Sequence, residues 1–533
     1  MRTILCLIVL ALSGCGTYAQ STFTRMYQSG TSHTFDLNEL PSHNILTSMG
    51  TNHLLDPDGY ITHSSNYFGG GTYSTQTLKA IGDTEFYFTT GTSAAVCTTG
   101  GTGGLVHPVL GKMDALGNVL SMRRYDLNAA LCYNVPRDIE VTGDSGAITW
   151  GREYSFYAMR VNASLDHMWS KSVHRSGSFR FIKELPNGDL LAGINMDTAG
   201  VVVARMNADG EFIWAKSYIR PRGVVHDALI ESDSSFVVIG FTDSMATTGV
   251  FGPPPPPTFQ PKLFMMKLDG EGDVQWCRGW QSPTNLWYTP FTGTIERTLD
   301  SNYAVLANLG QEQNHNRFRP FLMKTDLNGD TIWTRSVGRG DFTYVTADLL
   351  PYSDGGFMIS GIIYGDVPGI GTGLKYIYKA DSLGHFPCWE RVHPVQTSDL
   401  FPVDSSFTLA AVDVPTTVTP VFVTDTVYDP NIFTTYDGCT FTTGISLDMH
   451  HAPSKPRIRP NPNTGRFTLA FADPLIAESY YGVYDAMGKL LYQRQLPQGR
   501  TTEEVDLSRY GPGTYVIRCT YRDGVWVERV VVE

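Results

Sequence analysis

The chain has 533 residues, of which 42% are hydrophobic and 17% are charged, and its formal net charge is −12. A negative chain without a basic run repels a phosphate backbone, so nucleic acid is excluded as a partner. Scarce charges together with 53 Gly, 27 Tyr and 27 Phe favour strands and turns over surface helices, and the length predicts two or more domains.

The N-terminus has the pattern of a secretory signal peptide, with Arg2 before an apolar stretch from Ile4 to Leu12 and small or polar residues after it. This stretch is too short to span a bilayer as a helix, and no later segment reaches the required length of about 20 apolar residues. Two cleavage sites compete. A cut after Ala19 leaves Gln20 first, whereas the four residues ending at Cys15 resemble a lipoprotein signal and leave a lipidated cysteine. We favour the first and assign residues 1–19 to the signal peptide.

A repeat fills the body of the chain, which we place at residues 20–445. Its first element is a basic residue, an Asp or Asn two positions later, a glycine three positions after that, and then a tryptophan. The Asp or Asn positions are Asp114, Asn162, Asn207, Asp269, Asp326 and Asp381. The tryptophans are Trp169, Trp214, Trp276, Trp333 and Trp389. Asp56 to Gly59 is a weaker first copy, and Leu165 replaces the glycine after Asn162.

A second repeated element is a polar turn followed by an alternating apolar strand. Its seven copies lie at 81–91, 141–151, 185–193, 231–240, 298–308, 352–361 and 403–412. Between Asp83 in the first copy and Asp404 in the last, the mean interval is about 54 residues. Alternation predicts strands, and Asp-x-x-Gly supplies the acceptor and the positive φ of a tight hairpin. Each unit is therefore predicted to be an antiparallel meander.

Short four-stranded units of this length pack better as a ring than as a line. The predicted fold is therefore all-β: a seven-bladed β-propeller, with six or eight blades also open, followed by a small C-terminal β-sandwich. A β-sandwich array or a solenoid is the alternative, and the variable repeat length disfavours the solenoid. Basic residues follow the tryptophans by two positions on the same strand face, so we expect the indole between units and the basic side chain at the rim. These residues are Lys171, Lys216, Arg278, Arg335 and Arg391.

Over about residues 50–410, units with a basic-x-Asp-x-x-Gly turn and a Trp alternate with units such as Asp354-Gly355-Gly356-Phe357. In this alternation the body resembles the propeller-like repeat proteins exported by Bacteroidetes. The resemblance is at family level and implies no particular activity.

Six cysteines remain after signal cleavage: Cys97, Cys132, Cys277, Cys388, Cys439 and Cys519. An oxidising compartment permits disulfides, and fifteen pairings are possible. We favour Cys388 with Cys439, and buried free thiols are the alternative. A run from Pro253 to Pro257 adopts polyproline II, which can dock into an aromatic groove or simply stiffen a loop.

No catalytic, cofactor or metal site is predicted. The chain has no Gly-x-Ser-x-Gly elbow, no His-Glu-x-x-His helix and no phosphate loop. The segments 269–273 and 326–330 space oxygen ligands like calcium loops but lack the twelfth-position acid, so we interpret both as hairpin turns. His450 and His451, beside the linker, are interpreted as solvated rather than metal-binding.

The composition changes near a linker assigned to residues 446–459, and a strand-rich domain is predicted at 460–533. Its motifs are PNPNTGRFTLAF (460–471), VYDAMGKLLYQ (483–493), VDLSRYGPGTYVIR (505–518) and VERVVVE (527–533). The motif residues are Pro460, Asn461, Pro462, Gly465, Tyr484, Asp485, Gly488, Leu507, Gly513 and Tyr515. Three turns between strands predict a sandwich of about seven strands.

In order and spacing these motifs resemble the type A sorting domain of the type IX secretion system. The resemblance implies that the outer-membrane translocon is a partner and that the cargo reaches the medium or the outer cell surface through the periplasm. Arg529 stands where the family often has Lys. An ordinary terminal Ig-like domain is the alternative.

Two functions remain open for the body. The favoured one is a binding or adhesion module for an extracellular glycan or protein, in which Trp287 and Tyr288 would suit stacking on sugars. The alternative is a secreted hydrolase acting on polysaccharide or peptide, with acids from several blades converging at the channel.

Overall fold

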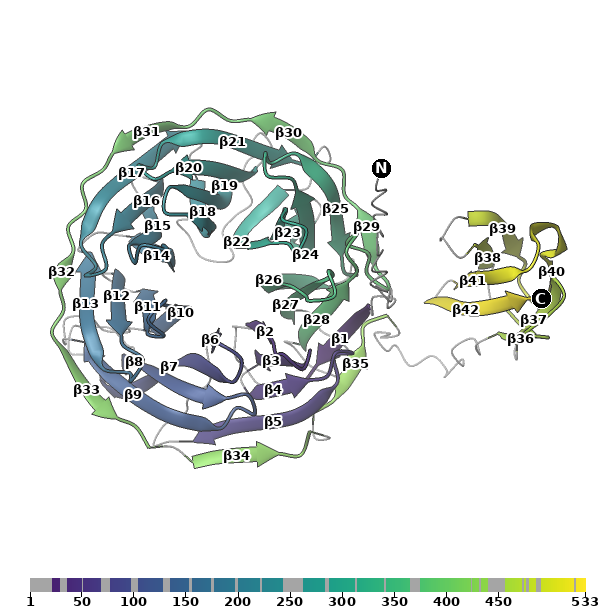
Figure 1. Ribbon diagram of the computed structural model, residues 1–533, viewed down its shortest axis with the longest axis horizontal. Coiled ribbons are helices and arrows are strands. Elements are labelled where there is room, and N and C mark those ends of the chain that lie inside the picture. The colour runs from purple at the N-terminus through teal and green to yellow at the C-terminus, as the bar shows by residue number, and fades with distance from the viewer. Residues whose placement is uncertain are drawn as a thin grey trace, which may run out of the picture.

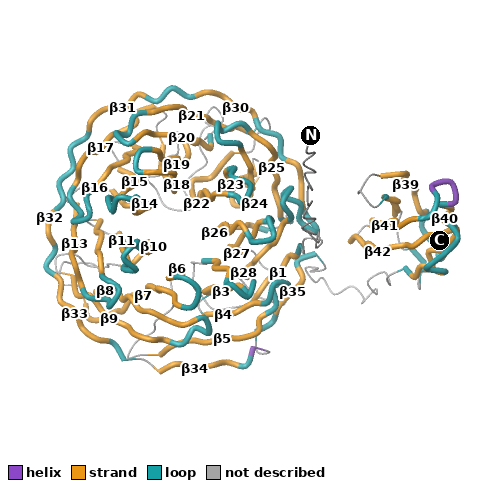
Figure 2. The backbone as a smooth tube through the Cα atoms, viewed as in Figure 1, coloured by secondary structure: helices purple, strands orange, loops and turns teal. Residues whose placement is uncertain are grey.

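The computed structural model of the chain contains a ring of seven five-stranded sheets and a small domain of two further sheets (Figure 1). It describes residues 22–28, 36–49, 51–68, 77–96, 104–127, 135–152, 156–173, 177–196, 200–220, 223–242, 262–282, 287–311, 314–339, 342–364, 374–422, 424–430, 433–439, 456–471, 474–475, 479–485, 490–521 and 524–533. The predicted all-β fold and the count of seven blades are confirmed. In Figure 2 most of the described residues lie in strands. No described helix is long and apolar enough to cross a membrane.

Four antiparallel strands of each blade form a meander that starts at the central channel and ends near the rim (Figure 1). Blades 1 and 2 consist of β2 (Leu37–Glu39), β3 (Ile45–Ser48), β4 (Asn52–Leu55) and β5 (Ile61–Phe68), then β6 (Thr77–Ile81), β7 (Glu85–Val96), β8 (Gly104–Asp114) and β9 (Val119–Leu127). Blades 3 and 4 consist of β10 (Val135–Val141), β11 (Ala147–Arg152), β12 (Phe156–Val161) and β13 (His167–Val173), then β14 (Gly177–Glu184), β15 (Leu190–Met196), β16 (Gly200–Met206) and β17 (Phe212–Arg220). Blades 5 and 6 consist of β18 (Gly223–Ser232), β19 (Ser235–Thr242), β20 (Leu263–Asp269) and β21 (Val274–Gln281), then β22 (Trp287–Arg297), β23 (Tyr303–Gln311), β24 (Asn314–Thr325) and β25 (Thr331–Val337).

Blade 7 closes the ring with a strand from the other end of the sequence. Its strands β26 (Thr343–Pro351), β27 (Phe357–Tyr364) and β28 (Leu374–Ala380) are completed by the N-terminal β1 (Phe23–Tyr27), which pairs with β28. Phe23 and Arg25 of β1 lie against Gly59 in the turn of blade 1, as Trp169 and Lys171 lie against Gly210 in the turn of blade 4. The aromatic-x-basic signature of the fourth strand is thus present in Phe23-Thr24-Arg25, where it was missed.

The Asp or Asn positions of the repeat begin tight hairpins between the third and fourth strands. In blade 5 the Asp269 carboxylate accepts the N–H groups of Glu271 (3.0 Å) and Asp273 (2.8 Å), and Gly272 has a φ of 76°. Asp114, Asn162, Asn207, Asp326 and Asp381 accept the equivalent pair of N–H groups. These oxygens are therefore occupied by backbone donors, as in a hairpin.

The tryptophans of blades 3 to 6 pack onto the turn of the following blade. The ring of Trp214 lies so close to Gly272 that a Cβ on this glycine would come within 2.8 Å of it, and its indole N–H donates to the Gly270 carbonyl at 3.1 Å. The equivalent pairs are Trp169 with Gly210, Trp276 with Gly329, and Trp333 with Gly384. The indoles thus lie as wedges between neighbouring units, which is where the repeat predicts them. We call their place on the fourth strand the wedge position.

Trp389 is an exception to this pattern. It has a φ of 58°, is 42% exposed, and follows the last hairpin instead of lying in a fourth strand. Its assignment as the tryptophan that packs between units in the last repeat was wrong, because β1 forms the fourth strand of blade 7. Arg391, assigned with it, lies in the strand β29 beside blade 6.

Blade 2 has no tryptophan at the wedge position. At its contact with blade 3 the large side chain lies on the turn instead of on the strand. Ser121 stands where blades 3 to 6 have Trp, and the facing turn of blade 3 carries Leu165 instead of glycine. Leu165 is 1% exposed at a φ of 63°, and its carbonyl accepts the Tyr125 hydroxyl at 2.6 Å. A large side chain on the turn thus compensates for a small one on the strand.

A fifth strand is added to every blade by one continuous segment, residues 388–439, which we name the belt. Its strands, green at the rim in Figure 1, are β29 (Glu390–Val392), β30 (Gln396–Asp399), β31 (Val403–Ser406), β32 (Val412–Asp413), β33 (Thr416–Pro420), β34 (Thr424–Tyr428) and β35 (Thr435–Asp437). They pair in turn with β25, β21, β17, β13, β9, β5 and β1. The segment 403–412 therefore belongs to the belt, and its prediction as a seventh repeat copy was wrong. The missed copy is the turn and strand at 41–48 in blade 1.

The belt advances by one blade every seven residues. Its anchoring residues are apolar, and their N–H groups donate to the carbonyl one position after the wedge position of the outer strand. They are Leu400 to Cys277 (2.9 Å), Phe407 to Ala215 (2.8 Å), Val414 to Ser170 (2.8 Å) and Val421 to Met122 (3.0 Å). This short period differs from the interval between blades in the sequence, which is why the repeat did not reveal the belt.

Basic side chains beside the wedges connect the belt to the ring. Lys216 of blade 4 forms ion pairs with Asp273 in the turn of blade 5 and with Asp404 of the belt (3.4 Å). Lys171 pairs with Glu211 and with Asp413 (2.7 Å), and Arg278 with Asp330 (3.3 Å) and Asp399 (2.8 Å). An exposed pair contributes only about 0.2–1 kcal/mol, so the repetition of the pair matters more than any single one.

A disulfide between Cys388 and Cys439 joins the two ends of the belt, with the Cα atoms 5.6 Å apart. The favoured pairing is confirmed. Cys277 and Cys519 are buried free thiols.

The C-terminal domain is a sandwich of two sheets. One contains β36 (Arg457–Arg459), β37 (Arg466–Ala470) and β40 (Thr502–Asp506); the other contains β38 (Ser479–Tyr484), β39 (Leu490–Leu496), β41 (Gly513–Tyr521) and β42 (Gly524–Val532). Both sheets contribute to one core, for example Leu469 and Val505 from the first and Val483 and Ile517 from the second. A single helical turn, η2 (Ser508–Tyr510), precedes β41. Because β36 pairs with β37, the domain starts inside the segment predicted as linker.

Several predictions fall on residues outside those described. They concern the signal peptide with Cys15 and Gln20, Cys97, Cys132, Pro253–Pro257, His450, His451, Gly488 and the side chains of Trp287 and Tyr288.

We expect Trp214→Ala to lower the free energy of unfolding by about 2–3 kcal/mol, because it removes a large ring wedged between two blades. Ile213→Ala, on the same strand but 54% exposed, is the matched control and should cost less than about 0.5 kcal/mol. Urea denaturation followed by far-UV circular dichroism measures both. Equal losses would contradict the wedge.

Candidate functional site: the charged central channel

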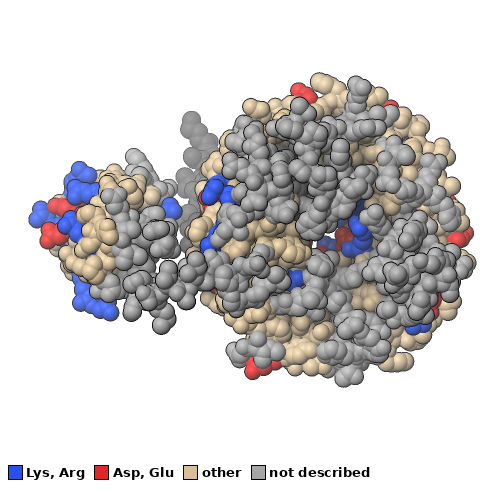
Figure 3. All heavy atoms as spheres, turned by 180° about the vertical axis from the view of Figure 1, so that it is seen from behind, with Lys and Arg blue, Asp and Glu red and all other residues tan. Residues whose placement is uncertain are grey.

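The first strand of each blade, or in blade 1 the residue just before it, presents charged side chains to the central channel, and blue and red side chains gather around the opening of the ring in Figure 3. These are Asp36, Lys79, Asp138, Glu140, Lys183, Asp227, Glu296 and Asp348. Lys79 of blade 2 interacts electrostatically with carboxylates from four other blades, namely Asp36, Asp348, Asp138 and Glu296. The channel therefore concentrates six acids and two bases, none of which the sequence motifs identified.

The two lysines lie between acids from neighbouring blades. The Nζ atom of Lys183 is 3.8 Å from Glu140 of blade 3 and 3.7 Å from Asp227 of blade 5. The Nζ atom of Lys79 is 3.7 Å from Asp36. Burial opposes the charge of both lysines, but the surrounding carboxylates outweigh it and raise the pKa of each.

Three channel aspartates also connect adjacent blades through the backbone. Asp36 accepts the N–H of Leu78 at 2.6 Å, from blade 1 to blade 2. Asp348 accepts the N–H of Leu37 at 2.8 Å, from blade 7 to blade 1, and Asp227 accepts that of Ile295 at 3.2 Å, from blade 5 to blade 6. Because an unpaired buried N–H is costly, these acids have a structural role whatever else they do.

Burial keeps part of the acid ring protonated near neutral pH. It raises the pKa of Asp36 to about 7 and that of Glu296 to about 7, and it raises the pKa of Glu140 and Asp348 as well. A carboxyl group that titrates near neutrality can donate or accept a proton at that pH. In the described part of the chain, no three His, Cys, Asp or Glu side chains are placed to hold a metal ion.

A serine, a histidine and a glutamate meet at the seam between blades 7 and 1. The Nδ1 atom of His43 is 2.9 Å from Glu39 and 2.9 Å from the Oγ of Ser353. In a nucleophilic triad the carboxylate and the nucleophile bind opposite ring nitrogens, whereas here both bind Nδ1. The cluster ties a turn of blade 7 to blade 1, and the wide separation of its residues in the sequence left no signal.

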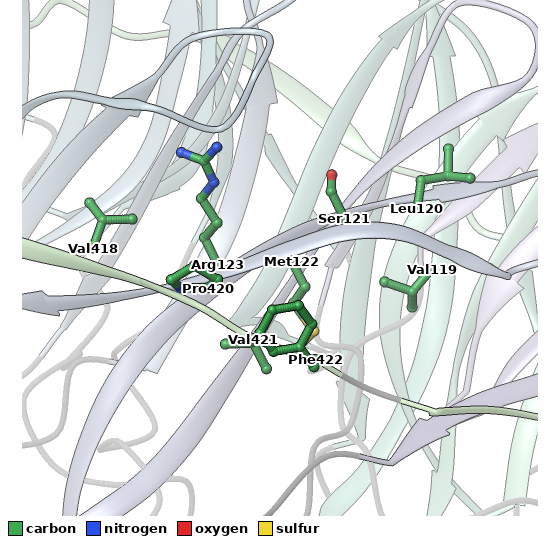
Figure 4. A pocket seen from close by; sticks show the side chains of 9 residues that line it. All are labelled: Val119, Leu120, Ser121, Met122, Arg123, Val418, Pro420, Val421 and Phe422. Carbon is green, nitrogen blue, oxygen red and sulfur yellow. The ribbon is translucent and has the colours of Figure 1, made fainter.

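A pocket of about 620 Å³ lies at the rim, between β9 and the belt (Figure 4). It is lined by Val119, Leu120, Ser121, Met122, Arg123, Val418, Pro420, Val421 and Phe422. Phe422 is 90% exposed and Leu120 54% exposed. The last backbone bond from the belt to β9 is the one to Met122, so the pocket lies where the belt leaves this strand.

The Asn-Pro-Asn motif of the C-terminal domain holds the final strand. Asn461 donates from Nδ2 to the Arg529 carbonyl at 2.8 Å and accepts the Val531 N–H at 2.9 Å. The N–H of Asn463 donates to the Val531 carbonyl, and its side chain accepts the N–H of Gly465. The motif thus fixes β42 to the start of the domain.

The other motif residues lie at turns and in the core of this domain. Leu507 is fully buried, and its N–H donates to the Gly465 carbonyl at 2.6 Å. The Tyr515 hydroxyl donates to the Tyr510 carbonyl at 2.9 Å, across the turn before β41, where Gly513 begins the strand. Tyr484 ends β38 with Asp485 next to it, while Pro460 and Pro462 flank Asn461.

The chain is thus a belted seven-bladed propeller followed by a sandwich domain with a pinned last strand. Residues 457–533 match the family model described as the secretion system C-terminal sorting domain. This segment is therefore a sorting domain, and it indicates export by type IX secretion to the cell surface or the medium. The predicted resemblance is confirmed for this part of the chain.

Solved structures similar to this chain are propellers with low identity. They include the Dos1 propeller (10% identity, 67% of this chain and 95% of the other, TM-score 0.37) and YCF48 bound to D1 peptide (13%, 67% and 96%, 0.36). A protein of unknown function from Bacteroides caccae matches at 10% identity over 59% of this chain and 93% of its own, with a TM-score of 0.34. No curated protein matches the chain. At these scores the matches carry no argument about function.

The raised carboxyl pKa values predict a stability that falls as the pH rises. Between the ordinary pKa of a glutamate and about 7, the folded protein binds more protons at Glu296 than the unfolded chain does. The resulting stabilisation is complete at acid pH and is lost as the pH passes through 7. Glu296→Gln should therefore flatten the decline in the urea midpoint between pH 5 and pH 8.

Glu528→Gln in the C-terminal domain is the control for this measurement, since Glu528 is exposed in β42. It should leave the pH dependence unchanged. An identical decline in the parent and in Glu296→Gln would show that Glu296 does not contribute.

Proposed function

We propose that the protein is a type IX secretion cargo whose propeller binds an extracellular glycan or protein at the cell surface or in the medium. The observation that carries the proposal is the sorting domain at 457–533, with its last strand held by Asn461. The proposal includes an N-terminal signal peptide at 1–19 and passage through the periplasm. A closed disulfide between Cys388 and Cys439 suits such an oxidising route.

The geometry of the ring supports a binding role. Wedges, belt and channel aspartates fix each blade to its neighbours, so the ring is a rigid support for connecting loops. One end of the ring carries the tight hairpins, and the strands at the other end are joined by longer connections, for example from Thr242 to Leu263 and from Tyr364 to Leu374. We place ligand binding at this second end, where Trp287 and Tyr288 begin β22.

One observation favours the hydrolase alternative: Asp36 and Glu296 have pKa values near 7 in a channel shared by other acids. Against it, Asp36, Asp227 and Asp348 already accept backbone N–H groups of neighbouring blades. We therefore favour binding and treat the enzyme as an outcome of the test.

Deleting residues 456–533 in the native host should retain the protein in the periplasm, because the segment that the translocon recognises is lost. Cell fractionation with mass spectrometry of the mature termini measures this and also distinguishes a Gln20 from a Cys15 start. A full-length Gln495→Ala variant, changed at an exposed position of the same domain outside the four motifs, is the control. Secretion of the truncated protein at the normal level would contradict the export role.

A glycan array and a peptide library probed with purified residues 20–445 test the binding role, and we expect retention of at least one ligand class. Release of reducing ends or peptide fragments, lost in Glu296→Gln, would replace the binding proposal by the hydrolase. If the protein neither retains a ligand nor cleaves a substrate, both the binding proposal and the hydrolase alternative are contradicted.

A further inference from the structure

We infer that the disulfide between Cys388 and Cys439 is a redox latch: when a dithiol reduces it, the belt opens at blade 7 and its last strand, β35, detaches from β1, while the blades themselves stay folded. The latch follows from where the two cysteines lie. They are the first and last residues of a segment that touches all seven blades, so their bond turns the belt into a closed hoop around the ring.

Both seams of the molecule meet at this point. The ring itself closes where β1 joins β28 through five paired residues, and the belt closes where β35 joins β1 through three. The hydroxyl of Thr24 in β1 is 3.1 Å from the Sγ of Cys439 and 3.7 Å from that of Cys388. The latch therefore sits directly on the strand that closes the ring.

The contacts that hold β35 to β1 after reduction are few and local, whereas β1 itself keeps its five-residue pairing with β28 and its buried Phe23, Met26 and Tyr27. Gly438 donates its N–H to the Thr24 carbonyl at 2.9 Å, and its own carbonyl accepts the indole N–H of Trp389 at 3.0 Å. Arg25 is 3.4 Å from Asp437, whose side chain is 46% exposed. A pairing this short frays readily once its covalent tether is broken. Opening is thus confined to β35, since β1 stays paired with β28 and the middle of the belt keeps its anchors at Leu400, Phe407, Val414 and Val421.

The latch is accessible, whereas the other thiols that the structure describes are not. Cys388 and Cys439 are both partly exposed, so a small dithiol can reach them. Cys277 is 4% exposed and Cys519 is fully buried, and burial raises the pKa of the Cys277 thiol to about 12. Among the cysteines that the structure describes, the bond between Cys388 and Cys439 is therefore the one that reduction breaks.

The chemistry is an ordinary exchange. A thiolate of the dithiol attacks one Sγ and breaks the bond between Cys388 and Cys439, and the second thiol then displaces that cysteine from the mixed disulfide. Two electrons pass to the protein and two protons end on its thiols, while the dithiol becomes a cyclic disulfide. Reoxidation by a disulfide of the same class reverses the exchange.

Hydrogen–deuterium exchange of the full chain with and without dithiothreitol tests the latch. We expect at least tenfold faster exchange in β35 after reduction, with no change in β15 and β16 of blade 4. The double variant Cys388→Ser, Cys439→Ser should show the fast pattern without reductant and no response to it. Reoxidised parent protein should return to slow exchange.

Two results would overturn the inference. Unchanged exchange in β35 on reduction would show that this strand is held without the disulfide. Faster exchange in all blades together would show that the bond stabilises the ring as a whole. If the double variant fails to fold, reduction of the folded parent, monitored by mass spectrometry of the alkylated thiols, still decides between these outcomes.

Discussion

The packing of an aromatic ring on a glycine of the next blade is the contact on which the rest of the rim depends. The glycine is required twice, because its φ is positive and because the ring leaves no room for a Cβ, as at Gly272 below Trp214. The exchange of Ser121 and Leu165 between blades 2 and 3 shows that the constraint is one of shared volume, since the large group moves from the strand to the turn. With blades spaced in this way, the basic residue two positions on reaches both the next turn and the belt.

The belt adds long-range closure to a ring of local meanders. Each meander pairs only residues close in the sequence, whereas β1 and the belt bring the two ends of the body together at blade 7. Closing so long a loop costs chain entropy, and a covalent bond between the ends of the belt reduces the number of open conformations. The disulfide is therefore placed where the two ends of the belt meet and where the ring closes through a strand from the other end of the body.

Sequence periodicity predicted the blades well and their closure poorly. Asp-x-x-Gly hairpins and alternating strands carry a local signal, so 352–361 and 298–308 were correctly placed in blades. The segment 403–412 misled because a belt strand alternates like any other strand, and only its pairing with β17 and β13 distinguishes it. The channel acids were invisible for a related reason, since Asp36, Lys79 and Asp348 become neighbours only when the ring closes.

The channel illustrates how a structural demand can produce chemistry. Adjacent first strands diverge from the channel and leave N–H groups such as that of Leu78 without a sheet partner, and an aspartate from the neighbouring blade accepts them. Acids collected for this purpose share a narrow space, so burial raises the pKa of several, and Lys79 and Lys183 offset only part of their charge. Proton binding near neutrality then follows from the closure of the ring. A catalytic acid must not be occupied in accepting backbone N–H groups of a neighbouring blade. Glu296 is the channel residue at which a substitution separates proton transfer from this structural role.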